Sequence, residues 1–230
     1  MIRALLSSGG DPMLVVMQLL STAFVVFFTL PIHQYAQALV ATKLGDQTPR
    51  LSGRLTLSPL AHIDIIGALM IFLVGMGYGK PVPINMHNFD MKNKKVGVAL
   101  VSLASPVSSL ILAVIFIFLN NVCAVIYEFT AMPELLSTII AYFFYFAASI
   151  NVTLAVFSLI PIPPLAGSRI LFAFIPDKYY YTIMRYERQI MIVMMILIFT
   201  GVFTTPLSYL SNWIYNGLNL IVSLPFTLIR

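Results

Sequence analysis

The stretch "LPIHQYAQALVATKLGD", Leu30 to Asp46, places three polar side chains in the middle of very apolar sequence. His33, Gln34 and Gln37 have the spacing i, i+1 and i+4, so His33 and Gln37 share one face of a predicted helix. Two histidines at this spacing bind zinc in metalloproteases, where a glutamate after the first histidine polarises the attacking water. Here both other positions carry carboxamides. The stretch alone leaves three interpretations open, which are a metal site, the remains of one, and an ordinary helix with a hydrogen-bonded structural histidine.

The composition around this stretch is that of an integral membrane protein. Of the 230 residues, 60% are hydrophobic and only 9% are charged, and the mean hydropathy is +0.95. Soluble domains carry about 25% charged residues, which cover their surface in water. The net charge of +5 is small and lies in loops, which indicates cytoplasmic loops rather than nucleic-acid binding. Cys123 is the single cysteine, which excludes an intrachain disulfide and a cysteine-rich zinc site.

Uncharged runs predict the membrane helices. Residues 13–30 contain no charged side chain, and a helix of this length covers about 27 Å, close to the thickness of a bilayer core. Pro31 then predicts a kink, because proline removes a backbone donor. Further membrane helices are predicted at residues 96–122, with an interruption at Pro106, at residues 135–160, from residue 190 onward, and at residues 213–229, the last as a span or an interfacial helix.

Two segments between these helices are irregular. Residues 47–64 contain Thr, Ser, Gly and Pro with partial alternation of leucines, which predicts a short hairpin or loop. Residues 65–79 are apolar but glycine-rich and short for a span, which favours a re-entrant or partly embedded helix.

The distribution of Lys and Arg predicts the orientation. The loops at 43–54, 80–95 and 169–188 carry these residues, whereas the loops at 121–134 and 204–217 carry none, so we place the first group in the cytoplasm. The expected fold is an all-α polytopic membrane protein with five or six transmembrane helices and one re-entrant or hairpin segment. We expect a single membrane-embedded domain over 1–230, with a core at 13–172 and additional C-terminal membrane helices at 188–230.

Five sequence motifs resemble, in order, those of the site-2 protease family of intramembrane zinc metalloproteases. They are "HQYAQALVATKLGD", "GRLTLSPLAHIDIIG", "GKPVPIN", "ASPVSSLILA" and "NVTLAVFSLIPIPPLAGSRIL", and together they run from about residue 20 to residue 172. The resemblance implies a site-2 protease-like helical bundle, a zinc cofactor in the family, and cleavage of substrates within the membrane.

The resemblance also implies roles for single residues. The family's motifs are His-Glu-x-x-His and a later Pro-x-Pro-x-x-Asp-Gly, in which the two His and the Asp hold zinc and the Glu is the general base. In this sequence His33 matches the first ligand, Gln34 stands at the base, Gln37 at the second His and Ala166 at the Asp.

Other family positions are kept or changed near the end of the motif set. Asn151 matches a family asparagine, and we expect it to bind substrate together with two prolines of the "PIPPLAG" loop, Pro161 and Pro164. Ser105, Ser109 and Ser158 stand where the family usually has Gly, Asn and Asn.

These substitutions remove the chemistry of the family. Gln34 cannot accept a proton from water, and general base catalysis contributes roughly 10²–10⁴-fold. Gln37 offers only a neutral amide oxygen and Ala166 offers nothing, whereas a catalytic zinc needs three protein ligands and an open position. We therefore expect no bound zinc and a pseudoprotease whose cleft binds a transmembrane-helix client or another membrane-protein partner.

Several alternatives remain open on the sequence. The chain could be an active zinc metalloendopeptidase with a site rebuilt from His62, Asp64 or His87, or a deliberately inactivated form of an active protease. A small transporter is a further alternative. The expected location is a prokaryotic plasma membrane, as a multi-pass protein with the vestigial site toward the cytoplasmic side and no nucleic-acid partner.

Overall fold

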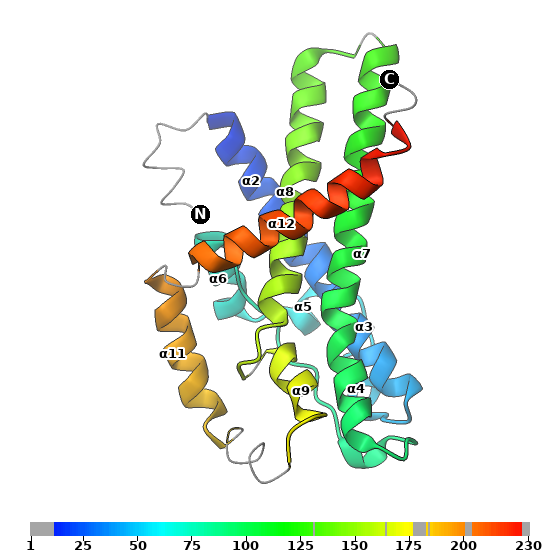
Figure 1. Ribbon diagram of the computed structural model, residues 1–230, viewed down its shortest axis with the longest axis vertical. Helices are drawn as coiled ribbons and strands as arrows, with labels where there is room; N and C mark the ends of the chain where they lie inside the picture. Colours follow the sequence, from blue (N-terminus) through cyan, green and yellow to red (C-terminus); the bar gives the residue numbers. More distant parts are fainter. Residues whose placement is uncertain are drawn as a thin grey trace.

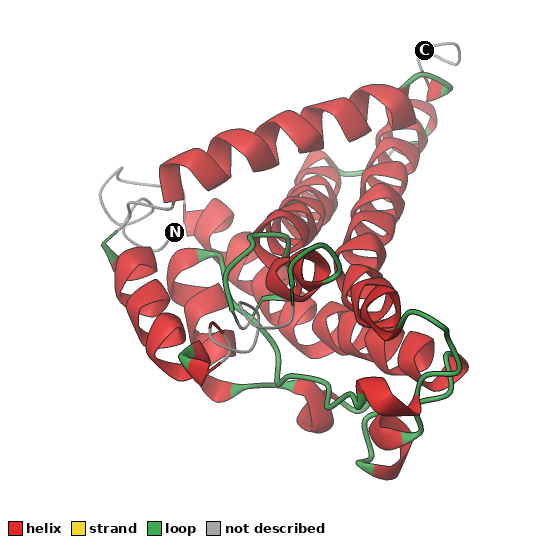
Figure 2. Ribbon diagram, turned by 60° about the horizontal axis from the view of Figure 1, so that its bottom comes forward, coloured by secondary structure: helices red, strands yellow, loops and turns green. Residues whose placement is uncertain are grey.

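The computed structural model describes residues 12–130, 132–163, 165–176, 183, 185–200 and 204–226. All regular secondary structure in these ranges is helical (Figures 1 and 2), which confirms the predicted all-α fold. Three helical stretches in these ranges are long and apolar enough to cross a membrane, namely Pro12–Lys43, Lys94–Phe129 and Glu134–Ser158. The larger number of five or six spans stays a prediction.

The first stretch is one continuous helical run that changes its winding before Pro31. It consists of α2 (Pro12–Phe24), a π-helical turn (Val25–Thr29) and α3 (Leu30–Lys43). Proline cannot donate to the carbonyl four residues earlier and its ring crowds that carbonyl, and a wider turn is a common local adjustment. The irregularity expected at Pro31 therefore takes the form of the π-helical turn, one turn before His33.

The two longest helices, α7 (Lys94–Phe129) and α8 (Glu134–Ser158), form an antiparallel pair (Figure 1). Asn93 caps α7, since its side chain accepts from the backbone N–H groups of Lys95 and Val96. The predicted interruption at Pro106 is wrong, because α7 continues through this residue. Packing against α3, α8 and α9 holds α7 together where local preference alone would break it.

Short helices occupy the segment between α3 and α7. They are α4 (Thr48–Leu51), α5 (Pro59–His62), α6 (Ile65–Val74) and a 3₁₀ turn (Met86–Asn88). Of the hairpin or loop predicted at 47–64, the hairpin is wrong, because prolines at the first turns of α4 and α5 start helices there. Residues 52–58 between these helices form a loop. At ten residues, α6 is too short to span a bilayer, and its re-entrant placement stays a prediction.

A buried carboxylate ties this segment together. Asp46 accepts hydrogen bonds from the backbone N–H of Thr48 at 3.0 Å, the backbone N–H of Asn85 at 2.7 Å and the side-chain amide of Asn88 at 3.1 Å. The Thr48 hydroxyl also donates to it. Burial alone would raise the pKa of Asp46, but these hydrogen bonds together lower it below its usual value. We call Asp46, Thr48, Asn85 and Asn88 the Asp46 cluster.

The remaining described helices complete the bundle. They are α9 (Ala166–Phe172), α11 (Glu187–Phe199) and α12 (Thr204–Ser223). In Figure 1, α12 crosses α7 and α8 obliquely. Its aromatic residues Tyr209 and Trp213 are exposed. Figure 1 also places α4 and the start of α7 at the end opposite the turn between α7 and α8. The Lys- and Arg-bearing loops near those two elements therefore lie together, as the predicted orientation requires.

Candidate functional site

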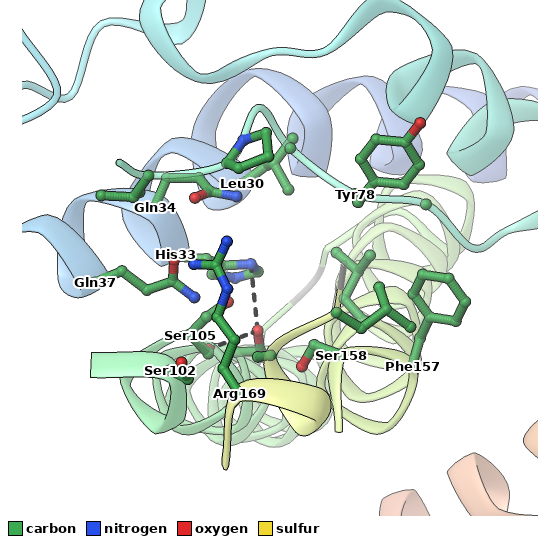
Figure 3. A pocket seen from close by; sticks show the side chains of 18 residues that line it. Leu30, His33, Gln34, Gln37, Tyr78, Ser102, Ser105, Phe157, Ser158 and Arg169 are labelled. Carbon is green, nitrogen blue, oxygen red and sulfur yellow. Dashed lines mark hydrogen bonds between the residues drawn. The ribbon is translucent and has the colours of Figure 1, made fainter. Parts of the chain in front are cut away.

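A small pocket lies where α3, α7, α8 and the start of α9 meet beside the extended segment 77–82 (Figure 3). Its volume is about 80 Å³. Its lining includes four of the residues predicted from sequence, which are His33, Gln34, Gln37 and Ala166. The other described lining residues that carry polar side chains are Tyr78, Ser102, Ser105, Ser109, Ser158 and Arg169.

His33 is buried, and both of its ring nitrogens take part in hydrogen bonds within the protein. Nε2 lies 3.1 Å from Oδ1 of Asn151, and Nδ1 lies 3.2 Å from Oγ of Ser109. The amide group of Asn151 donates to the carbonyl of Ala147 at 2.8 Å, which leaves Oδ1 facing the ring. With its proton on Nε2, His33 presents Nδ1 to the hydroxyl of Ser109. The single proton of that hydroxyl is placed to serve both Nδ1 and the carbonyl oxygen of Ser105, 3.1 Å away.

This arrangement places a hydrogen-bonding neighbour at each ring nitrogen of His33, whereas a metal would need a free lone pair on one of them. Zinc binds a neutral imidazole through a nitrogen that carries no hydrogen. In His33 one nitrogen is protonated toward Asn151 and the other receives the hydroxyl of Ser109. A metal could bind this ring only after one of these two hydrogen bonds breaks.

Gln34 is also buried, with 8% of its surface exposed. Its Oε1 atom has no hydrogen-bond partner in the described part of the chain. Its amide nitrogen lies close to Gly79, where an added Cβ would approach it to 2.6 Å. Glycine at this position thus lets the segment 77–82 pass directly over Gln34, whose neutral carboxamide cannot serve as a general base.

The start of α9 holds Ala166 at the pocket because Gly167 packs against the end of α8. A Cβ on Gly167 would lie 2.1 Å from the carbonyl oxygen of Leu159 and 2.5 Å from that of Ile160. The position that the resemblance assigns to a zinc-binding carboxylate is therefore at the pocket, but it presents a methyl group.

The three residues predicted to bind substrate have different places. Asn151 is fully buried and holds His33, so its contact is with the protein. Pro161 is exposed and does not line the pocket. Pro164 lies outside the described residues.

The residues present do not fit a catalytic zinc. In the part of the chain that the structure describes, no three residues of the types His, Cys, Asp and Glu come together. His62 donates through Nε2 to the carbonyl of Thr56 at 2.7 Å, Asp64 caps α6 through the N–H of Gly67, and His87 lies in the exposed 3₁₀ turn. These three residues do not converge with His33 into a rebuilt site.

Sequence reasoning missed three polar residues of the pocket, which are Tyr78, Ser102 and Arg169. The spacing along the helices could have indicated two of them. Arg169 follows Ala166 by three positions on α9, and Ser102 precedes Ser105 and Ser109 by three and seven positions on α7. Residues at these spacings share a helix face. The serine stripe and the arginine could therefore have been assigned to the same cavity as Ala166.

Comparisons with known proteins were made over the whole chain. Residues 12–202 match the family described as "Peptidase family M50". The chain is 37% identical over 199 residues to "Putative zinc metalloprotease YwhC" of Bacillus subtilis (strain 168), covering 86% of this chain and 85% of that protein. It is 29% identical over 150 residues to "Putative zinc metalloprotease Rip2" of Mycolicibacterium smegmatis (strain ATCC 700084 / mc(2)155), covering 60% of this chain and 51% of that protein. No solved structure matches the chain.

Proposed function

Since the chain belongs to peptidase family M50, the site-2 protease family, we propose that it binds membrane-spanning clients in the family's cleft without hydrolysing them. The family assignment supplies the membrane-embedded helical fold and the parent activity. The residues of this chain's own pocket are the reason for proposing that it does not hydrolyse its clients.

The observation that carries the proposal is the state of His33. The ring is locked between Asn151 and Ser109, and the other motif positions, Gln34, Gln37 and Ala166, contribute two carboxamides and a methyl group. Hydrolysis of a peptide bond in this family needs a metal-activated water and a base to take its proton. This pocket offers neither three ligands nor a carboxylate base, so no hydrolytic step can be derived from its residues.

Retention of a cleft is supported by the non-helical backbone around the pocket. The segment 77–82 and the turn between α8 and α9 both contribute lining residues. Irregular backbone at membrane depth is tolerated only where it is buried in protein or lines a wet cavity. The pocket therefore suits a short unwound stretch of a client helix, whose exposed peptide groups need polar partners.

The proposal is tested with the purified full chain in lipid nanodiscs and a fluorescent peptide with a single apolar span of about 20 residues. Binding is followed by fluorescence anisotropy and peptide integrity by mass spectrometry, with zinc in excess. We expect binding with the peptide intact. Cleavage that depends on added zinc and disappears in the His33→Ala variant would contradict the proposal.

A further inference from the structure

We propose that this pocket recognises the free C-terminal carboxylate of a bound peptide through Arg169, while Gln34 accepts the N–H of the same terminal residue. The inference rests on the proposed client binding and specifies which part of a client the site selects. It is carried by three polar groups of the pocket that have no partner in the described part of the chain.

The first group is a cation without a counter-charge. Arg169 is the one Asp, Glu, Lys or Arg residue among the described residues that line the pocket. Its side chain extends from α9 toward the part of the pocket where His33 and Gln37 lie (Figure 3). Its guanidinium group has no hydrogen-bond or ion-pair partner in the described part of the chain. Arg169 is half-buried, and a guanidinium matches a carboxylate through two parallel hydrogen bonds.

The other two groups are buried and neutral. Ser102 is 2% exposed and Gln34 is 8% exposed. Among the residues that the structure describes, neither Oγ of Ser102 nor Oε1 of Gln34 has a hydrogen-bond partner. Buried polar atoms are nearly always paired, so an unpaired set at one cavity points to a missing ligand. The ligand must accept from Arg169 and Ser102 and must donate to Gln34.

A peptide C-terminus has this combination of groups. Its carboxylate offers acceptors to Arg169 and to the hydroxyl of Ser102, and the N–H of its last residue is a donor for Oε1 of Gln34. An internal peptide segment has the donor but no charge. A phosphate group has the charge but no N–H beside it. The cavity of about 80 Å³ holds roughly two to three water volumes, which suits a terminal carboxylate and its amide.

The substitutions at the motif positions make the pocket suitable for an anion. Gln34 and Ala166 stand where the resemblance places two carboxylates, and both line the same pocket as Arg169. Carboxylates there would compensate the arginine and repel an incoming carboxylate. Their absence leaves the positive charge of Arg169 available to a ligand.

The test compares two forms of one fluorescent peptide, a single apolar span that ends in a free carboxylate or in a carboxamide. Binding to the full chain is measured by anisotropy in nanodiscs of uncharged phosphatidylcholine. Because one charge-assisted interaction is at stake, the free acid should bind roughly tenfold or more tightly than the amide. Arg169→Gln should abolish this preference, whereas Arg50→Gln, on the exposed helix α4, should keep it.

The outcomes separate this inference from the proposed function. Equal binding of acid and amide to the unmodified chain overturns the C-terminal site but leaves client binding intact. Binding of neither form contradicts client binding itself. Displacement of the acid peptide by inorganic phosphate, at concentrations where acetate has no effect, would overturn the proposal in favour of a phosphate site. The acid–amide comparison needs no variant, so it decides the question even if Arg169→Gln fails to fold.

Discussion

The Asp46 cluster and the pocket around His33 are two polar regions of the same apolar molecule, and they differ in how completely their polar atoms are paired. Both oxygens of Asp46 accept hydrogen bonds, from Thr48, Asn85 and Asn88. In the pocket, Oε1 of Gln34 and Oγ of Ser102 have no hydrogen-bond partner in the described residues. A fully paired cluster stabilises the fold, whereas unpaired buried atoms at a cavity indicate a place for a ligand.

The pocket itself also contains both paired and unpaired polar groups. His33 contacts Asn151 through one ring nitrogen and Ser109 through the other. The buried polar atoms of the pocket without a partner in the described residues lie on α3 and α7, and Arg169 of α9 lines the same pocket. The hydrogen bonds of His33 therefore hold the fold together, and the polar groups that could meet a ligand belong to other residues of the pocket.

The largest expected change is a gain of zinc in a chain with restored motif positions. The combined substitution Gln34→Glu, Gln37→His and Ala166→Asp supplies the missing ligands and base. Releasing one hydrogen bond from His33 costs about 1 kcal/mol, which is small beside the roughly 10–16 kcal/mol that zinc binding provides in structural sites. Elemental analysis should show zinc rising from near zero to about one ion per chain.

The matched control replaces Gln37 by Leu in place of His within the same triple substitution. This variant lacks one of the three ligands and should stay close to zinc-free. Zinc uptake by the control equal to that of the restored chain would mean that the metal binds elsewhere.

The next largest effect is expected in the Asp46 cluster. Asp46→Ala removes the acceptor for Thr48, Asn85 and Asn88 together, so the free energy of unfolding should fall by about 2–4 kcal/mol. Thermal unfolding in detergent measures this loss. Asp90→Ala changes an exposed carboxylate in the same segment and should cost less than about 0.5 kcal/mol. Equal losses in both variants would remove the distinction between the regions.

The contribution of Asp46 should also depend on pH. Its pKa is lowered in the folded protein, so its contribution is fully present above the unfolded value of about 3.9 and is lost as the pH falls through the folded value. The difference in midpoint temperature between the unmodified chain and Asp46→Ala should therefore narrow as the pH is lowered from 7 to 3. A difference that widens in acid would contradict the assigned hydrogen bonds.

The smallest effect separates two serines within the pocket. Ser109→Ala loses the hydrogen bond to His33 and should cost about 1 kcal/mol, whereas Ser102→Ala removes an unpaired hydroxyl and should be close to neutral. Both serines are almost fully buried on α7, so cavity effects are matched. A larger loss for Ser102→Ala would show that its hydroxyl already has a structural partner.

Much of the fold could be predicted from uncharged runs of sequence. The apolar runs at 13–30, 96–122 and 135–160 predict the three long helices that the structure contains. Local sequence patterns predicted the wrong secondary structure where tertiary packing and helix-starting prolines determine it. Alternating leucines at 47–64 suggested a hairpin, but Pro49 and Pro59 start short helices there. Number, depth and orientation of the spans depend on the bilayer and stay predictions.

The sequence predicted the part of the candidate site that is formed by the motif residues. The spacing of His33, Gln34 and Gln37 placed these three residues together, and the family resemblance assigned Ala166 to the same site. All four line one pocket. The partners of His33 were not predictable, because Asn151 is 118 residues away along the chain and meets it only through the packing of α8 against the first helical stretch. For the same reason the sequence could not show which buried polar atoms remain unpaired.

The coordination chemistry of His33 can be tested by the zinc content of the unmodified protein. The chain is purified without chelators, dialysed against micromolar zinc and then against metal-free buffer, and analysed by inductively coupled plasma mass spectrometry beside His33→Ala. We expect a zinc content near zero for both proteins. About one zinc per chain in the unmodified protein, absent from His33→Ala, would contradict this expectation.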